Sequence, residues 1–262
     1  MSCKDKQPSK RSSVLWAGTE AQVYLGQTEV GVWTPLANHC DVQWLNCVSA
    51  IEGWGHGVDL LWQLNPSPRK QHVALWLSGA LARPFILQAV EGLGRWSEAA
   101  QVAAGVAPDA TGLLGPCDVW LDHWKPDVAC LAIAFDRSTR STIEQVARDK
   151  RVRLTAMRPW WVNAVNRSAK ELGPQTRLLA VEETDALTVL VGTDGRLTWA
   201  SSLAPRPQAG QMEDALTRAM LATNVSAVNA RRTRMGTRLH APSPTGSHQQ
   251  AEPFAVQLEP LG

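Results

Sequence analysis

AVEETDALTVLVGTDGRL, residues 180–197, is the stretch that best indicates the fold of this chain. The aliphatic and β-branched residues in and around it predict strands over Arg177–Glu182 and Ala186–Gly192. Thr193-Asp194-Gly195 is typical of a tight hairpin turn, and Arg196–Leu203 is predicted as the return strand. The segment therefore predicts a three-stranded antiparallel meander.

The same kind of meander is predicted a second time, near the start of the chain. Glycine-containing turns separate its three short strands. A helical pattern follows each meander, at 42–64 with an interruption at Gly53–Gly57, and at Gln211–Thr223. The three early strands are expected at Ser13–Trp16, Ala21–Leu25 and Glu29–Thr34.

A βαβ unit is predicted between the two meanders. Ser141 and Glu144 have the spacing of a capping box at the start of an amphipathic helix. The apolar strand Val128–Phe135 precedes this helix, and the strand Val152–Met157 follows it, so the two strands should be parallel. Pro159 ends the unit, and a further helix is expected from Trp160.

The order of elements resembles the actin-like ribonuclease H fold, in which two meanders each open an α/β half. The stretch His72–Phe135, with its strands and one helix, resembles the small subdomain inserted in the platform proteins of type IV pilus and type II secretion machines (PilM/GspL type). The second meander is similar to that family's "VDIG…TTL…DGxL" segment. The resemblance covers about residues 13–224 and implies an α/β actin-like fold with a small inserted α/β subdomain. Strands beyond Thr223 are not evident, so the second half is expected to be truncated.

Five segments are expected from this comparison and from composition. The leader is polar and basic, and the tail is rich in Pro, Ser, Thr and Gln with few aliphatic residues, which is typical of disorder. The segments are a disordered leader at 1–12, the first meander and helix at 13–71, the inserted subdomain at 72–136, the rest of the actin-like core at 137–230, and a disordered tail at 231–262.

The resemblance also points to two phosphate-binding hairpins, which carry a D-x-G sequence in active actin-like ATPases. Glycine lets backbone N–H groups approach phosphate oxygens, and the carboxylate orients metal-bound water. The matching places here are Trp16-Ala17-Gly18, where an indole replaces the acid, and Glu182-Glu183-Thr184, where the glycine is lost. No P-loop or GxGxxG motif is present. We therefore expect no catalytic residues and no cofactor, with degenerate hairpins at Trp16, Gly18, Glu182 and Thr184.

Charge and hydropathy exclude several classes of protein. The 26 Lys and Arg against 24 Asp and Glu give +2, with +3 on residues 1–11 and +2 from Arg231 onward, which leaves −3 on the core. A mildly acidic core argues against a nucleic-acid groove. The longest apolar run, Val128–Phe135, is far shorter than the roughly 20 residues of a membrane span. The apolar stretch near the N-terminus is too short for a signal peptide, so a cytoplasmic location, or one peripheral to the inner membrane, is expected.

Other groupings of reactive residues give weaker signals. His39-Cys40-Asp41 with Cys47 fits no common zinc spacing, and no metal site is predicted. The pair Cys117 and His123 is a weak candidate for a nucleophile and base. The five cysteines are odd in number, have no CxxC pair, and are interpreted as reduced thiols.

The sequence Arg158-Pro159-Trp160-Trp161 is the strongest candidate for partner binding. Adjacent helical residues diverge by about 100°, so one indole is expected to face the core and the other to lie toward the subdomain seam or toward solvent, where it could anchor a partner. The leading hypothesis is a non-catalytic cytoplasmic scaffold, not an enzyme, that binds a protein such as the cytoplasmic segment of an inner-membrane component of a pilus or secretion apparatus. The alternatives are a nucleotide-dependent phosphotransferase or ATPase with a rearranged site, and a carbohydrate-binding protein rich in Trp.

Overall fold

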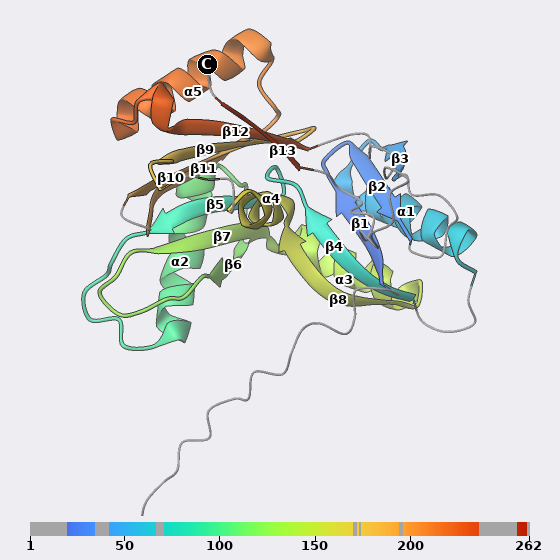
Figure 1. Cartoon of the computed structure of the whole chain (residues 1–262). Coiled ribbons are helices and arrows are strands. Elements are labelled where there is room, and N and C mark those ends of the chain that lie inside the picture. The colour runs from blue at the N-terminus through green and yellow to red at the C-terminus, as the bar shows by residue number, and fades with distance from the viewer. Residues whose placement is uncertain are drawn as a thin grey trace, which may run out of the picture.

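The computed structural model describes residues 20–34, 42–66, 71–169, 172, 174–193 and 196–235, and the backbone of 256–260. Two five-stranded sheets and one three-stranded sheet make up this part of the chain (Figure 1). A single apolar core cluster includes residues of all three sheets, from Val23 through Phe135 to Val181.

The first large sheet has the strand order β3-β2-β1-β4-β8. β1, β2 and β3 form the antiparallel meander, while β4 pairs in parallel with both β1 and β8. The helices α1 and α3 pack against each other beside this sheet, and Trp54 of α1 donates its indole N–H to the carbonyl of Ile143, at 3.0 Å. The elements are β1 (Ala21–Leu25), β2 (Glu29–Trp33), β3 (Gln43–Asn46), α1 (Ala50–Leu64), β4 (Gln71–Leu77), α3 (Arg137–Asp149) and β8 (Val152–Pro159).

The second large sheet repeats this arrangement with the strand order β11-β10-β9-β12-β13. Again three strands form a meander, a helix follows, and a fourth strand, β12, returns parallel to the first. β13 then pairs with β12 in the antiparallel direction, unlike β8 in the first half. The elements are β9 (Leu178–Glu182), β10 (Leu187–Thr193), β11 (Arg196–Leu203), α5 (Ala209–Thr223), the 3₁₀ turn η1 (Ala227–Asn229), β12 (Ala230–Met235) and β13 (Val256–Pro260).

The small sheet, with the order β5-β7-β6, is packed against α2 and lies beneath the second large sheet in Figure 1. Its elements are β5 (Ala82–Leu87), α2 (Trp96–Thr111), β6 (Cys117–Leu121) and β7 (Cys130–Asp136). The insertion therefore begins at β5, after the turn at Ser78–Leu81. The expected start at residue 72 is wrong, because β4 lies between β1 and β8 in the first large sheet.

The predicted βαβ unit has the right order but the wrong pairing. β7 belongs to the small sheet and β8 to the large sheet, so α3 connects two sheets and not two neighbouring strands. The helix also begins earlier than the capping-box signal indicated. Asp136 is its N-cap, and its carboxylate accepts a hydrogen bond from the N–H of Thr139 at 3.0 Å.

The region after the first two strands differs most from the prediction. Residues 43–46 form the third strand of the meander, and α1 runs without a break through Gly53–Gly57. These glycines allow close packing: a Cβ atom at Gly53 would lie 2.6 Å from Cys47 Sγ, and one at Gly57 would lie 2.8 Å from Val30 Cγ2. Ser13–Trp16 lies outside the described residues.

The second half extends further than expected. β12 and β13 lie within or next to the segment assigned to a disordered tail from residue 231, so that boundary is wrong for these residues. The second half is still shorter than the first, because no helix after η1 is present in the described part of the chain. Within the described residues, no helix is long and apolar enough to span a membrane.

The helix α4 (Trp160–Ser168) begins directly after Pro159, as predicted. Trp161 lies at the subdomain seam, where its indole N–H donates to the carbonyl of Ala82, the first residue of β5. The solvent-facing alternative is wrong, because Trp160 is 0% and Trp161 1% exposed. The reason is that α4 contacts β8 on one side and β9, β12 and β13 on another, so both divergent directions lead into protein. Arg158, in contrast, is exposed.

Candidate functional site

Three loops meet where the two halves of the chain face each other. They are the β1–β2 turn at Gly26–Thr28, the turn after β4 at Ser78–Leu81, and the β9–β10 turn at Glu183–Ala186. The first and third occupy equivalent positions in the two meanders. Among the described residues, the turn of the first meander that faces the β9–β10 turn is Gly26–Thr28. The predicted hairpin Trp16–Gly18 lies outside the described part of the chain and stays a prediction.

Two carboxylates of the second half hold the two loops of the first half. Asp185 Oδ2 accepts hydrogen bonds from the Gln27 N–H at 2.6 Å and from the Ser78 hydroxyl at 3.0 Å. Glu183 Oε2 accepts a hydrogen bond from the Gly79 N–H at 2.8 Å. We call these five residues the carboxylate clasp. Its hydrogen bonds join residues more than 100 positions apart in sequence.

The clasp is closely packed. A Cβ atom at Gly26 would lie 3.0 Å from Asp185 Oδ2, and one at Gly79 would lie 2.7 Å from Glu183 Oε2. Glu183 is 1% and Asp185 8% exposed. No space for a phosphate group is left between the backbone of these two glycines and the carboxylates.

Burial dominates the electrostatics of the clasp. Desolvation raises the pKa of Glu183 well above its usual range, and the neighbouring Asp185 charge raises it further. The pKa of Asp185 is also raised by burial, although its hydrogen bonds from Gln27 and Ser78 oppose the shift. Glu183 Oε1 and Asp185 Oδ1 are buried and have no hydrogen-bond partner among the described residues. Both carboxyls are therefore more easily protonated than exposed ones.

Tyr24 and Glu29 complete the first-half side of the site. The Tyr24 hydroxyl lies 3.4 Å from Thr184 Oγ1. Its pKa is raised well above its usual range, by burial first and then by the charges of Glu183 and Asp185. Burial also raises the pKa of Glu29. Thr184, a residue predicted for the degenerate hairpin, thus contacts the first half of the protein.

Glu182, the other predicted hairpin residue of the second half, has different partners. It accepts a hydrogen bond from Arg234 Nε at 2.8 Å, and Arg206 Nη1 lies 3.3 Å from its other oxygen. Arg232 Nε is 3.9 Å away. These arginines neutralise Glu182 within the second half, so its charge is not directed at the clasp.

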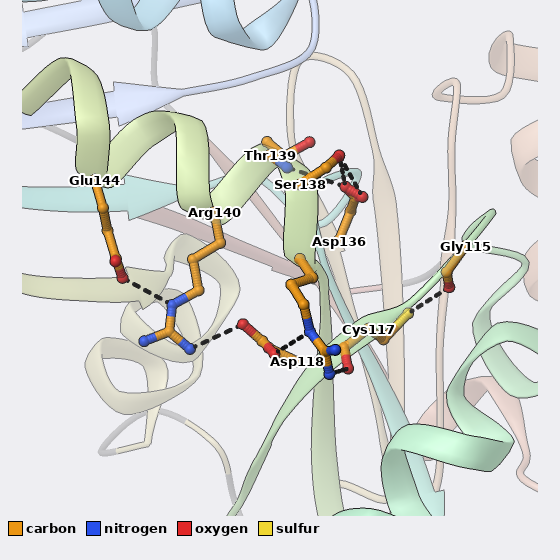
Figure 2. Close-up of polar contacts among 9 residues, drawn as sticks. Gly115, Cys117, Asp118, Asp136, Ser138, Thr139, Arg140 and Glu144 are labelled. Atoms are coloured by element: carbon orange, nitrogen blue, oxygen red, sulfur yellow. Dashed lines mark hydrogen bonds and ion pairs between the residues drawn. The ribbon is translucent and has the colours of Figure 1, made fainter.

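The weaker sequence candidates do not form a reactive centre. Cys117 is buried and its pKa is raised, mainly by desolvation. The neighbouring Asp118 accepts hydrogen bonds from Arg137 at 2.9 Å and Arg140 at 3.2 Å, which tie β6 to α3 (Figure 2). His123 is exposed and lies 3.6 Å from Asp122. His39, Cys40 and Asp41 lie outside the described residues, among which no three His, Cys, Asp or Glu are placed to hold a metal ion.

Chemically, the site consists of backbone N–H donors that are already bonded to internal carboxylates. N–H groups of glycine-containing turns can bind anions such as phosphate. Here the N–H groups of Gln27 and Gly79 donate to Asp185 and Glu183 instead. The two carboxyls of the clasp come from one short turn, Glu183-Thr184-Asp185. The D-x-G comparison was placed one residue earlier, on Glu182-Glu183-Thr184, and therefore did not include Asp185. The recurrence of the meander would have aligned this turn with Gly26–Thr28.

Two halves with the same strand order, joined at facing hairpins and interrupted by a small inserted subdomain, define the actin-like ATPase fold. Solved structures agree. A Bacteroides thetaiotaomicron protein with an actin-like ATPase fold matches 87% of this chain and 86% of its own, at 12% identity and a TM-score of 0.50.

Two proteins of bacterial machines are also similar in structure. The cytoplasmic domain of EpsL, an inner-membrane component of the Vibrio cholerae type II secretion system, shares 13% identity over 70% of both chains, at a TM-score of 0.41. The PilM–PilN type IV pilus biogenesis complex matches 79% of this chain and 66% of that one, at 9% identity and a TM-score of 0.48. No protein-family model and no curated protein matches the sequence. The strand order of the two halves and the similarity to the Bacteroides protein establish the fold.

The raised pKa of Glu183 predicts an unusual dependence of stability on pH. A carboxyl whose pKa is higher in the folded state binds its proton more tightly there, so folding becomes less favourable as pH rises above the ordinary value of 4.5. Glu183→Gln removes this cost and retains an oxygen that accepts from Gly79. We expect the variant to gain stability over the wild type by up to about 1.4 kcal/mol per pH unit from pH 4.5 to the folded pKa.

Urea unfolding of both proteins at several pH values between 4.5 and 8 measures this difference. Glu91→Gln is the matched control, because Glu91 is exposed in the loop before α2. Its difference from the wild type should stay constant over this range. A Glu183→Gln variant that is less stable than the wild type at pH 8 would show that the ionised carboxylate is required.

Proposed function

We propose that this protein is a non-catalytic actin-like scaffold that binds another protein. The carboxylate clasp is the observation that supports this proposal. In it, the backbone N–H groups of Gln27 and Gly79 are bonded to Asp185 and Glu183. A nucleotide would have to displace both carboxylates and place its phosphates beside them. That displacement costs the existing hydrogen bonds, and it adds repulsion between the phosphates and each carboxyl that is ionised.

The clasp also supports a permanent association of the two halves. Nucleotide-driven closure needs halves whose contact depends on the bound ligand. Here the second half supplies its own hydrogen-bond acceptors, the carboxyl groups of Glu183 and Asp185, to loops of the first half. The closed arrangement is therefore stabilised without nucleotide, which suits a rigid platform more than a cycling ATPase.

The setting we propose is a pilus or secretion apparatus, with the protein in the cytoplasm or peripheral to the inner membrane. This part of the proposal is supported by the resemblance of the order of elements, and of the second meander, to the platform proteins of pilus and secretion machines. The partner class is a cytoplasmic segment of an inner-membrane component. The second candidate, an ATPase with a rearranged site, would require the carboxylates to swing away, since they fill the position of the phosphates.

Titration calorimetry with Mg-ATP at millimolar concentration tests the non-catalytic part. We expect no heat of binding and no change in thermal stability. A ligand at 100 times its dissociation constant would stabilise the protein by about 2.7 kcal/mol, so a melting experiment with Mg-ATP is a sensitive second measurement. A dissociation constant in the low micromolar range would overturn the proposal and favour the ATPase alternative.

A further inference from the structure

The first large sheet has a face that the described helices leave partly open. β1, β4 and β8 are parallel neighbours, and parallel strands are normally covered on both faces. One face packs in the core through residues such as Val23, Val73 and Leu75. The opposite face carries a groove of about 480 Å³ that is lined by residues of all three strands.

Small residues form the floor of this groove and large ones form its ends. Ala74 of β4 is paired with Ala156 of β8, so two methyl groups lie side by side. Two residues before Ala74, His72 is paired with Arg153; two residues after it, Trp76 is paired with Arg158. Each end of the groove therefore combines an aromatic side chain of β4 with an arginine of β8.

The groove is positively charged at neutral pH. Arg153 and Arg158 are both exposed, and Glu20 is the one acidic side chain among the described residues that line it. The charges of His72 and Arg158 act on Glu20 and oppose the rise in its pKa that burial causes. This interaction shows that these side chains converge on one region. The Trp76 indole donates to Gln22 Oε1 at 3.0 Å, which fixes the wall between β1 and β4.

The charges of the chain argue against its own segments as occupants. Residues 1–11 carry +3, and residues 236–255, between β12 and β13, contain one arginine and one glutamate, so neither segment supplies a pair of acidic residues for an arginine-rimmed groove. A two-fold pairing of two copies through this face would bring the same cationic rim against itself. A partner with acidic side chains suits the groove better.

We propose that this groove, which we call the β4–β8 groove, is the docking site for an amphipathic helix of another protein that carries two acidic residues seven or eight positions apart. The two ends are about 13 Å apart along the strands, and seven or eight helical positions rise about 10.5–12 Å, a difference that the length of Asp and Glu side chains covers. Residues i and i+7 lie on the same helix face. Small apolar residues between them would meet the Ala74 and Ala156 floor. This inference rests on the proposed function and names its partner class and surface.

A displayed library of 20-residue helices, randomised on one face and selected against the full chain, tests the proposal. We expect enriched sequences to carry Asp or Glu at a spacing of seven or eight. Their affinity, measured by fluorescence anisotropy of a labelled peptide, should fall at least tenfold for Arg158→Ser and for Arg153→Ser. Ala156→Phe fills the floor without changing charge and should also abolish binding. Arg148→Ser is the matched control, because Arg148 is an exposed arginine on α3 that does not line the groove.

Several outcomes would overturn the inference. Enriched helices without the acidic pair, or helices that bind the Arg158→Ser variant equally well, would exclude the β4–β8 groove as their site. Competition by a synthetic peptide of residues 1–19 would show that this chain supplies the occupant. Self-association in analytical ultracentrifugation that Arg158→Ser abolishes would point to a second copy. The melting temperatures of the variants should equal that of the wild type, which shows that a loss of binding is not a loss of folding. The Mg-ATP titration tests the proposed function separately, because it does not depend on the β4–β8 groove.

Discussion

Replacing Trp161 by alanine is expected to lower the free energy of unfolding by about 3–5 kcal/mol, the usual range for a buried Trp truncated to alanine. Trp161 is 1% exposed and belongs to the core cluster shared by the three sheets. Its indole N–H donates to the carbonyl of Ala82 at 2.9 Å, which connects α4 to the first residue of β5. Truncation thus opens a cavity and leaves a buried carbonyl without its donor, at the place where the insertion joins the large sheet.

Chemical denaturation of the variant and of Trp96→Ala measures the effect. Trp96 is 55% exposed at the start of α2, so its removal should change stability by no more than about 0.5 kcal/mol. Two conservative variants, Trp161→Phe and Trp160→Phe, separate the contribution of the indole hydrogen bond from that of packing. Trp161→Phe loses a hydrogen bond, whereas the Trp160 Nε1 atom has no partner among the described residues, so Trp160→Phe should cost less. Near-wild-type stability of Trp161→Ala would contradict its placement in the core.

Local sequence patterns predicted those strands and helices that have a clear apolar pattern and a turn or cap signal at their ends. The second meander was predicted because aliphatic and β-branched residues are concentrated in β9, β10 and β11 around a turn signal, and β1 and β2 were predicted for the same reason. β12 was missed because its sequence ARRTRM contains three arginines and resembles a polar tail. Those arginines are accommodated because Glu182 on the neighbouring strand accepts from Arg234.

Errors elsewhere arose where tertiary packing reverses a local preference. Glycines normally interrupt helices, yet Gly53 and Gly57 lie within α1 because the strands beside them leave no room for a Cβ atom. The two tryptophans of α4 diverge as helical geometry requires, but neighbouring strands cover both directions. The recurrence of the meander indicates which two hairpins are equivalent, but the hydrogen bonds of the clasp could not be derived from sequence, because they connect loops on different halves of the protein. A turn containing two acids gives no local sign of which N–H groups it will meet.

Replacing Gly79 by alanine is expected to lower stability by about 1–3 kcal/mol, the range typical of overpacking a filled site. The new Cβ atom would lie 2.2 Å from Thr188 Oγ1 and 2.7 Å from Glu183 Oε2, both within the second half of the chain. The methyl group would therefore push the turn after β4 away from β10. The hydrogen bond from the Gly79 N–H to Glu183 would lengthen, and the clasp would open on that side. Gly105→Ala is the control: Gly105 is exposed within α2 with no atom near its Cβ position, so alanine should stabilise the helix by about 0.5–1 kcal/mol.

A double-mutant cycle connects this loss to the contact between the halves. Thr188→Ala alone should cost about 1 kcal/mol, because it removes the 2.6 Å hydrogen bond to Ser202. In the double variant, the oxygen closest to the new methyl group is absent, so Gly79→Ala should be markedly better tolerated than in the wild type. The two losses should then sum to more than the loss of the double variant. Strictly additive losses would mean that the strain at Gly79 does not arise from β10, and the tight apposition of the two halves at the clasp would then be incorrect.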